Sequence, residues 1–121
     1  MPSKKRKFGD IGEDVARKYL VKIGYSIIGK NYQTKFGEID IVAKNDREIL
    51  FIEVKTSDIN SFIRPEENLT QNKLRKLLKT VELYIISNDL PETYTWRVDL
   101  ISIKLNQETR KASLEHFKGI S

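Results

Sequence analysis

Two apolar segments separated by a short polar loop constrain the fold of this chain more than any other feature. Residues 39–43 and 49–55 are rich in isoleucine, valine and phenylalanine, which favour β-strands, and the residues between them are polar. Their separation is a common length for a hairpin connection. The pattern therefore predicts two antiparallel strands, and these strands carry ionisable residues that apolar strands rarely contain without a use for them.

The predicted hairpin brings three ionisable residues to one place. A turn centred on the polar loop pairs Val42 with Phe51, and the same register sets Asp40 beside Glu53. Because side chains alternate along a strand, Glu53 and Lys55 share one face. Facing carboxylates, about 5 Å apart at Cβ, repel each other unless a cation lies between them. The hairpin therefore predicts a divalent metal site with Asp40 and Glu53 as ligands.

These three residues suit phosphodiester chemistry. Mg²⁺ prefers hard oxygen ligands and is commonly held by one or two carboxylates, with waters and substrate phosphates completing its coordination shell. A metal on Asp40 and Glu53 would acidify a bound water and stabilise charge on the attacked phosphate. Lys55 would position or deprotonate that water, or stabilise the pentacovalent phosphate, and the sequence leaves these roles open. The alternative is an ordinary salt-bridge cluster on a solvated sheet face, against which the apolar surroundings argue.

Length and composition limit the classes of protein that the chain can form. At 121 residues it is large enough for one domain with its own core, which we expect over residues 9–121. It has no cysteine, which excludes disulfides and thiolate catalysis and is compatible with a reducing cytoplasm. No apolar run approaches the roughly 18 residues of a membrane span, and no apolar segment of a secretory signal follows the basic start. We therefore expect a cytoplasmic protein with no membrane association.

Positive charge is concentrated near the N-terminus. The chain carries +5 overall, whereas residues 1–35 hold nine Lys and Arg against three Asp and Glu. Residues 1–8 are predicted to be a flexible basic arm, which suits contact with a phosphate backbone but would also suit a tail that only keeps the protein soluble. The residues that we expect to contact nucleic acid are Lys4, Lys5, Arg6, Lys7, Lys35 and Lys73.

The other elements follow from periodicity and from breaking residues. The predicted elements are a helix at 10–23, strands at 25–32, 39–43 and 49–55, a helix at 65–88, and strands at 94–105 and 112–117. Asp10 is the expected N-cap of the first helix, Pro65 opens the second, and residues 56–64 are expected to be loop. This order predicts an α/β domain whose mixed central sheet is flanked by helices.

Glu13, on the first helix, has two explanations. With Asp10 as N-cap it falls at position N3, where a capping box would account for it. On a helical wheel it lies at the edge of the apolar stripe, from which it would reach a site on the sheet. Spacing alone favours the capping explanation. Gly12, inside the same stripe, indicates a close backbone approach to the sheet or to nucleic acid.

Several other polar and aromatic residues are predicted to be structural. Arg97 and Asp99 lie two apart on one strand face and are expected to form an ion pair. His116 is the only histidine, has no obvious partner in the sequence and is expected not to be catalytic. Trp96 and the apolar residues at helical spacing between Leu74 and Ile85 are expected in the core.

Together these residues resemble the YraN family of small bacterial nuclease-like proteins. The resemblance covers nearly the whole chain and is carried by Gly12-Glu13-x-x-Ala16, Gly37-Glu38-Ile39-Asp40 and Phe51-Ile52-Glu53-Val54-Lys55-Thr56. That family is similar to the restriction-endonuclease-like PD-(D/E)xK superfamily and to archaeal Holliday-junction resolvases, whose core has the order αβββαβ. The resemblance implies the same core here.

The resemblance also implies roles for individual residues. Asp40 would be the first acid, Glu53 and Lys55 the acid and lysine of the last motif, and Glu13 the helix-borne acid that completes the catalytic and metal site. This favours a functional Glu13. Some relatives of the superfamily have a proline where Ile39 stands in this sequence. Relatives are expected to have basic residues where Gln33 and Ser57 stand here, so some contacts with the nucleic-acid backbone are expected to be weaker in this protein.

The sequence therefore predicts an endonuclease that uses Mg²⁺ or Mn²⁺ to hydrolyse phosphodiester bonds in DNA, including branched or structured DNA. The alternative is a catalytically inactive nucleic-acid-binding module on the same fold, against which the intact acid and lysine set argues. A symmetric junction as substrate would suit a homodimer, although no feature of the sequence marks an interface.

Overall fold

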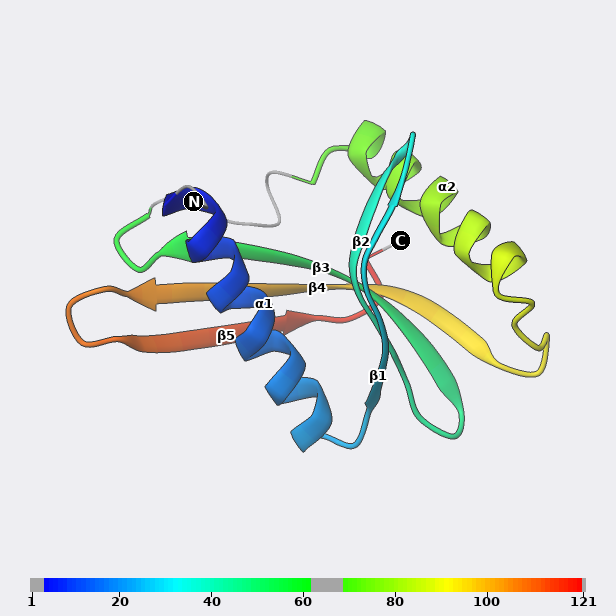
Figure 1. The fold of residues 1–121 in the computed structure, drawn as a ribbon, viewed down its shortest axis with the longest axis horizontal. Helices are drawn as coiled ribbons and strands as arrows, with labels where there is room; N and C mark the ends of the chain where they lie inside the picture. The colour runs from blue at the N-terminus through cyan, green and yellow to red at the C-terminus, as the bar shows by residue number, and fades with distance from the viewer. Residues whose placement is uncertain (1–3, 62–68, 121) are drawn as a thin grey trace.

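A five-stranded mixed sheet, with one helix on each face, forms the part of the chain described by the computed structural model, residues 4–61 and 69–120 (Figure 1). In chain order the elements are α1 (Lys4–Lys22), β1 (Ser26–Thr34), β2 (Gly37–Lys44), β3 (Glu48–Asp58), α2 (Gln71–Ser87), β4 (Thr95–Asn106) and β5 (Lys111–Phe117). The predicted αβββαβ core with a closing strand, and the α/β fold class, are confirmed. No helix in these ranges is long and apolar enough to span a membrane.

The strands lie side by side in chain order, β1-β2-β3-β4-β5. Neighbouring strands are antiparallel except β3 and β4, which are parallel and are connected through α2, as a parallel pair requires. The predicted pairing of Val42 with Phe51 is confirmed. The hydrophobic pattern and the short turn were therefore sufficient to set the register of the central hairpin.

The sheet divides into two arms at one point. Pairing between β2 and β3 ends at Ile41 and Ile52, whereas β1 and β2 stay paired as far as Thr34 and Gly37. Pairing between β3 and β4 continues in the other direction as far as Asp58. The β1–β2 hairpin consequently turns away from β3, β4 and β5 (Figure 1). We call this point the fork. It lies where each of the two apolar segments, counted from the turn between them, reaches its first ionisable residue.

Each face of the sheet has its own apolar core. The core under α1 contains Ala16, Leu20, Ile41, Leu50, Ile52 and Ile101, and the core under α2 contains Val42, Phe51, Leu77, Val81, Tyr84 and Val98. The expected core role of the α2 stripe is confirmed from Leu77 to Ile85, whereas Leu74, in the first turn of the helix, is only partly buried and belongs to neither core. Trp96 was also expected in the core, but it is 42% exposed, and the ring of Phe51 stacks edge-on against it. As the second residue of β4, it lies at the exposed end of the strand.

The first helix begins earlier than predicted. α1 starts at Lys4, so the prediction that Asp10 is its N-cap is wrong, and with it the capping box that would explain Glu13. Lysine and arginine are good helix formers and no proline follows Lys4, so the helix extends through the residues assigned to the basic arm. Residues 1–3, and the side chains of residues 4–6, lie outside what the structure describes.

Two further boundaries differ from the prediction. β3 extends to Asp58, so the predicted loop at Thr56 is wrong, because the backbone there pairs with the apolar strand β4 and this outweighs the polar side chains. The predicted start of the second helix at Pro65 lies outside the described residues. The helix that the structure shows begins at Gln71, after Thr70, whose side chain accepts a hydrogen bond from the backbone N–H of Lys73.

Candidate active site

Asp40 lies at the fork and is only 6% exposed. Its Oδ2 accepts a hydrogen bond from the backbone N–H of Val54 at 2.7 Å. This side chain replaces the backbone acceptor that β2 no longer supplies once the ladder has ended. The prediction that Asp40 and Glu53 form a ladder pair is therefore wrong, because pairing stops one position earlier. The register itself still brings the two residues to the same place.

Asp40 and Glu53 are close enough for their charges to interact. Burial raises the pKa of Asp40 to about 8, helped by the charge of Glu53 and opposed by the hydrogen bond from Val54. Burial also raises the pKa of Glu53, while the ammonium groups of Lys55 and Lys73 oppose that rise. Two carboxyl groups with raised pKa values, next to a lysine, are typical of functional sites. The structure thus places together three residues that the sequence predicted to act together.

Glu13 reaches this group from α1. Burial raises its pKa, with smaller contributions in the same direction from Asp10 and Glu38, and Arg17 opposes the rise. Its Oε1 is buried and, within the described part of the chain, has no hydrogen-bond partner. Such an atom is costly unless a ligand or ion satisfies it. This observation favours a functional role for Glu13 over a purely structural one.

The position of Glu13 depends on the glycine before it. A Cβ on Gly12 would lie 1.8 Å from Oγ1 of Thr56 and 2.9 Å from its Cβ. Any side chain at position 12 would therefore push α1 away from β3. The predicted close approach at Gly12 is confirmed, and the partner is the sheet.

Glu38 is a fourth carboxylate at the site, one that the sequence analysis did not select. Its charge contributes to the raised pKa values of Glu13, Asp40 and Glu53. Its Oε2 accepts a hydrogen bond from Nε2 of Gln33 at 3.0 Å. A signal was present in the sequence, because Glu38 stands two residues before Asp40 and alternation in a strand gives both the same face.

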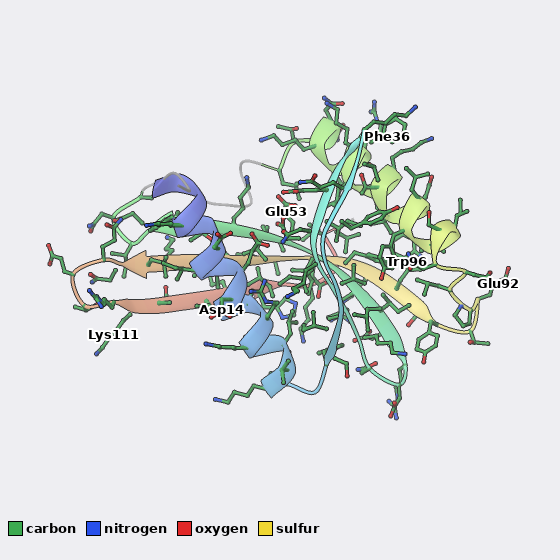
Figure 2. The ribbon with its side chains drawn as sticks, viewed as in Figure 1. Asp14, Phe36, Glu53, Glu92, Trp96 and Lys111 are labelled. Carbon is green, nitrogen blue, oxygen red and sulfur yellow. The ribbon has the colours of Figure 1, made fainter. Side chains whose placement is uncertain are left out.

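A hollow of about 250 Å³ adjoins the carboxylates, between the tip of the β1–β2 hairpin and α2. Figure 2 shows Phe36 at that tip and Glu53 near the fork. The charged residues lining the hollow are Glu38, Glu53, Lys55, Lys73 and Lys76. Two of the predicted basic residues are therefore close to it, since Lys73 lines it and Lys35 lies over the Phe36 ring. Lys7 instead lines a separate hollow with Ile11 and Arg110.

The donor set suits Mg²⁺ or Mn²⁺, because every candidate ligand is a carboxylate oxygen. Across residues 4–61 and 69–120, however, no three His, Cys, Asp or Glu side chains are close enough together to hold an ion. The predicted three-carboxylate set of Glu13, Asp40 and Glu53 is thus not preformed. Mg²⁺ commonly takes only one or two carboxylates and fills its other positions with water and phosphate, so the residues present fit an open site of that kind.

A partly buried chain of polar side chains, with Asp99 at its centre, lies elsewhere in the domain. The hydroxyl of Tyr19 and Nδ1 of His116 are hydrogen-bonded at 2.8 Å, and Nε2 of His116 donates to Oδ2 of Asp99 at 2.7 Å. Nε of Arg97 donates to Oδ1 of Asp99 at 2.9 Å, and its Nη1 donates to Oε2 of Glu48 at 2.7 Å. The Arg97–Asp99 pair is confirmed. The inference that His116 lacks a partner is wrong, because its partners lie on other elements.

This chain of polar residues holds Asp99 ionised. Burial alone would raise the pKa of Asp99, but hydrogen bonds from His116, from the backbone N–H of Gly119 and from Arg97 lower it below its ordinary value. Through Tyr19 the chain ties α1 to β4 and β5. Its contacts indicate a structural role in fixing the helix that also carries Glu13.

Comparison with known proteins agrees with the resemblance read from the sequence. The profile of the Uncharacterised protein family UPF0102 matches residues 12–103, a range that includes all four carboxylates and Lys55. A UPF0102 protein of Caldanaerobacter subterraneus subsp. tengcongensis is 40% identical over 116 residues, which are 96% of this chain and 93% of that protein. One from Campylobacter fetus is 41% identical over 109 residues, which are 88% and 92% of the two chains.

A more distant relative and one solved structure are also similar. A UPF0102 protein of Roseiflexus castenholzii is 30% identical over 116 residues, covering 96% of this chain and 94% of that protein. The structure of Pyrococcus furiosus SfsA in complex with Ca²⁺ is similar with a TM-score of 0.40 and 12% sequence identity, covering 97% of this chain and 65% of that chain. The likeness to SfsA is too distant to transfer any property of its site.

Proposed function

The chain belongs to the UPF0102 family, also called YraN, and from this premise we propose that it is a metal-dependent endonuclease that hydrolyses phosphodiester bonds in DNA. The observation that carries the proposal is the fork, where Asp40 and Glu53 interact beside Lys55 and beside an oxygen of Glu13 that has no hydrogen-bond partner among the described residues. Two buried carboxyl groups this close do not both ionise near neutral pH unless a cation compensates their charge. A metal ion would supply that cation and take the place of the proton on Asp40.

Asp40 and Glu53 would hold Mg²⁺ or Mn²⁺, and Oε1 of Glu13 would supply a further oxygen. Bound there, the metal would act as a Lewis acid on the phosphate and lower the pKa of a bound water. The hydrogen bond from Val54 keeps Asp40 oriented in the protein itself, so this ligand would need little rearrangement. The raised pKa of Asp40 means that metal binding would release a proton near neutral pH.

Lys55 would act on the substrate. Its ammonium group already interacts with Glu53 and it lines the hollow next to the carboxylates. From there it would orient the attacking water or stabilise the negative charge that builds on the phosphate. Lys73 and Lys76 line the same hollow and would bind neighbouring phosphates as point charges. The carboxylates would hold a metal, and the lysines beside them would bind an anionic substrate, so the site offers both kinds of group that the proposed reaction requires.

The proposal is tested with purified protein, Mg²⁺ or Mn²⁺, and a panel of labelled duplex, single-stranded, flap and four-way-junction DNAs. Wild type should cut at least one of them, whereas Asp40→Ala and Lys55→Ala should not. Asp46→Ala and Lys104→Ala are matched controls, since Asp46 lies in the turn at the other end of β2 and Lys104 lies on β4. If wild type cuts nothing, or the site variants cut as well as the controls, the enzymatic proposal fails.

The second candidate is a nucleic-acid-binding module that does not cut. It is favoured by one observation, that no three metal-binding side chains are gathered in the described residues. It predicts salt-sensitive DNA binding that Asp40→Ala leaves unchanged, with a log–log salt slope that reports the number of phosphates contacted. Sedimentation with and without a four-way junction would show whether the protein binds branched DNA as a homodimer.

A further inference from the structure

Phe36 is an aromatic residue at the tip of the β1–β2 hairpin, where turns usually carry small or polar residues (Figure 2). It is partly exposed and, among the described residues, belongs to neither apolar core. A ring in this position contributes little to the core. It is therefore available to contact a partner that approaches the carboxylates from the side of α2.

The tip is fastened to α2. The backbone N–H of Phe36 donates to Oγ1 of Thr34 at 3.1 Å, and Oγ1 of Thr34 is hydrogen-bonded to Oγ1 of Thr80 at 3.3 Å. Thr80 is fully buried and donates in turn to the backbone carbonyl of Lys76 at 2.9 Å. The backbone that carries the ring is thus held in place before any partner arrives, which lowers the entropic cost of binding.

Cations surround the ring. Nζ of Lys35 lies 5.2 Å and Nζ of Lys79 lies 5.6 Å from its centroid, both within cation–π distance. Lys73, Lys76 and Lys79 are spaced by three along α2, so they follow one another on one side of the helix. Both lysines over the ring are exposed. A planar group that stacks on the ring would displace one of them, and the ammonium group of that lysine would then be free to bind a phosphate.

The hollow runs from Phe36 to Glu53 and Lys55, and its volume is about 250 Å³. Ligand pockets are commonly about 300–1,000 Å³, so this one suits a single nucleotide and not a duplex. Stacking on Phe36 also requires a base with a free face, because neighbouring base pairs cover both faces of a base within a duplex. The fitting occupant is therefore an unpaired nucleotide.

We propose that the hollow is a subsite for one unpaired nucleotide of DNA, whose base stacks on Phe36 while Lys73, Lys76 and the displaced lysine bind its flanking phosphates. The inference rests on the proposed function and names its substrate class. The DNA that is cut carries an unpaired nucleotide next to the scissile phosphodiester, as at a flap or a branch point.

Binding is measured in EDTA, so that no cleavage is needed, by fluorescence anisotropy with three DNAs. These are a duplex with a single-stranded flap, the same duplex with abasic nucleotides in the flap, and a blunt duplex. Wild type should prefer the flap, and Phe36→Ala should weaken flap binding about 5- to 150-fold while leaving blunt-duplex binding unchanged. The abasic flap should bind wild type about as weakly as the normal flap binds Phe36→Ala.

Two further variants make the result decisive. Phe36→Leu keeps an apolar side chain without a ring and should also lose flap preference, and Trp96→Ala, which removes a half-exposed aromatic outside the hollow, should keep it. Circular dichroism checks that each variant is folded. The inference is overturned if wild type does not distinguish the abasic flap, or if Phe36→Ala weakens flap and duplex binding equally. If binding depends on the base but no DNA is cut in Mg²⁺, the proposed function is refuted while the nucleotide subsite is supported.

Discussion

Asp40 and Val54 are joined by a 2.7 Å hydrogen bond between the carboxylate Oδ2 and the backbone N–H, at the point where β2 and β3 cease to pair. The bond fixes the carboxylate at the fork and directs it toward β3, next to Glu53. Protonation of Asp40, or binding of a metal to it, therefore changes the charge at the point where the two arms of the sheet meet. The first prediction follows from this arrangement.

Asp40→Asn should make the protein more stable at high pH. The pKa of Asp40 is about 8 in the folded protein, against about 3.9 for an unperturbed aspartate, so the folded state binds the proton more tightly. The free energy of unfolding of wild type should therefore fall as pH rises from about 4 to about 8. Asparagine retains an oxygen acceptor for Val54 and does not ionise. Urea unfolding at about pH 5 and pH 9 should show a variant advantage of ~1–4 kcal/mol at the higher pH only. Parallel pH profiles for the two proteins would contradict this.

Gly12→Ala should destabilise the protein. Its Cβ would lie 1.8 Å from Oγ1 of Thr56, so α1 must move, at a cost of about 1–3 kcal/mol. Gly9→Ala, in the same helix, is the matched control because a Cβ there meets nothing within 4 Å. It should be neutral or stabilising by up to about 1 kcal/mol, because alanine is the better helix former. Chemical denaturation of both variants checks the difference, and equal effects would show that the contact with Thr56 is not restrictive.

Asp99→Asn should be costly at neutral pH and less so in acid. Asp99 is fully buried and bonded to His116 and Arg97, and losing one partner of a buried pair typically costs about 3–5 kcal/mol. The folded pKa of Asp99 lies below its ordinary value, so its contribution is present above about pH 4 and is lost as pH falls toward the folded pKa. The free energies of unfolding of wild type and Asp99→Asn, measured by chemical denaturation, should therefore converge in acid.

Asp46→Asn is an exposed control and should change stability by less than about 0.5 kcal/mol. A difference in unfolding free energy between wild type and Asp99→Asn that stays constant with pH would refute the pH argument.

Mg²⁺ should raise the melting temperature of wild type but not of Asp40→Asn or Glu53→Gln. A ligand that binds only the folded state stabilises it by mass action, by about 2.7 kcal/mol at a hundredfold excess over the dissociation constant. Glu108→Gln, in the exposed β4–β5 turn, should keep the full shift. Differential scanning fluorimetry across a Mg²⁺ titration measures this. An equal shift in all four proteins would indicate a nonspecific salt effect.

Local patterns were enough to predict the central elements of the fold. Alternating apolar residues and a short polar turn determined the pairing of Val42 with Phe51, and a glycine in the apolar stripe of a helix indicated the contact that Gly12 makes with Thr56. Asp40, Glu53 and Lys55 could be grouped because they lie on two consecutive strands. Short sequence separation and strand alternation are sufficient for such groupings.

Contacts between distant elements could not be predicted in this way. His116 is 97 residues from Tyr19 and 17 from Asp99, and only the packing of α1 over β4 and β5 brings the three together. The bond from Val54 to Asp40 depends on the ladder ending at Ile41 and Ile52, whereas the alternation of the two strands predicted that pairing would continue to Asp40 and Glu53. Glu38 was missed because a glutamate at the exposed start of a strand is usually solvated, although its place two residues before Asp40 on the same strand face was a signal that could have been used.

The central claim is that the carboxylates at the fork cut DNA with a bound metal. Single-turnover cleavage of the best DNA substrate in Mg²⁺ tests it most directly, by comparing wild type with Asp40→Asn, a variant that keeps an acceptor for Val54 but loses the charge. We predict a rate about 100-fold or more below that of wild type, with normal folding by circular dichroism. Equal rates for the two proteins would contradict the claim.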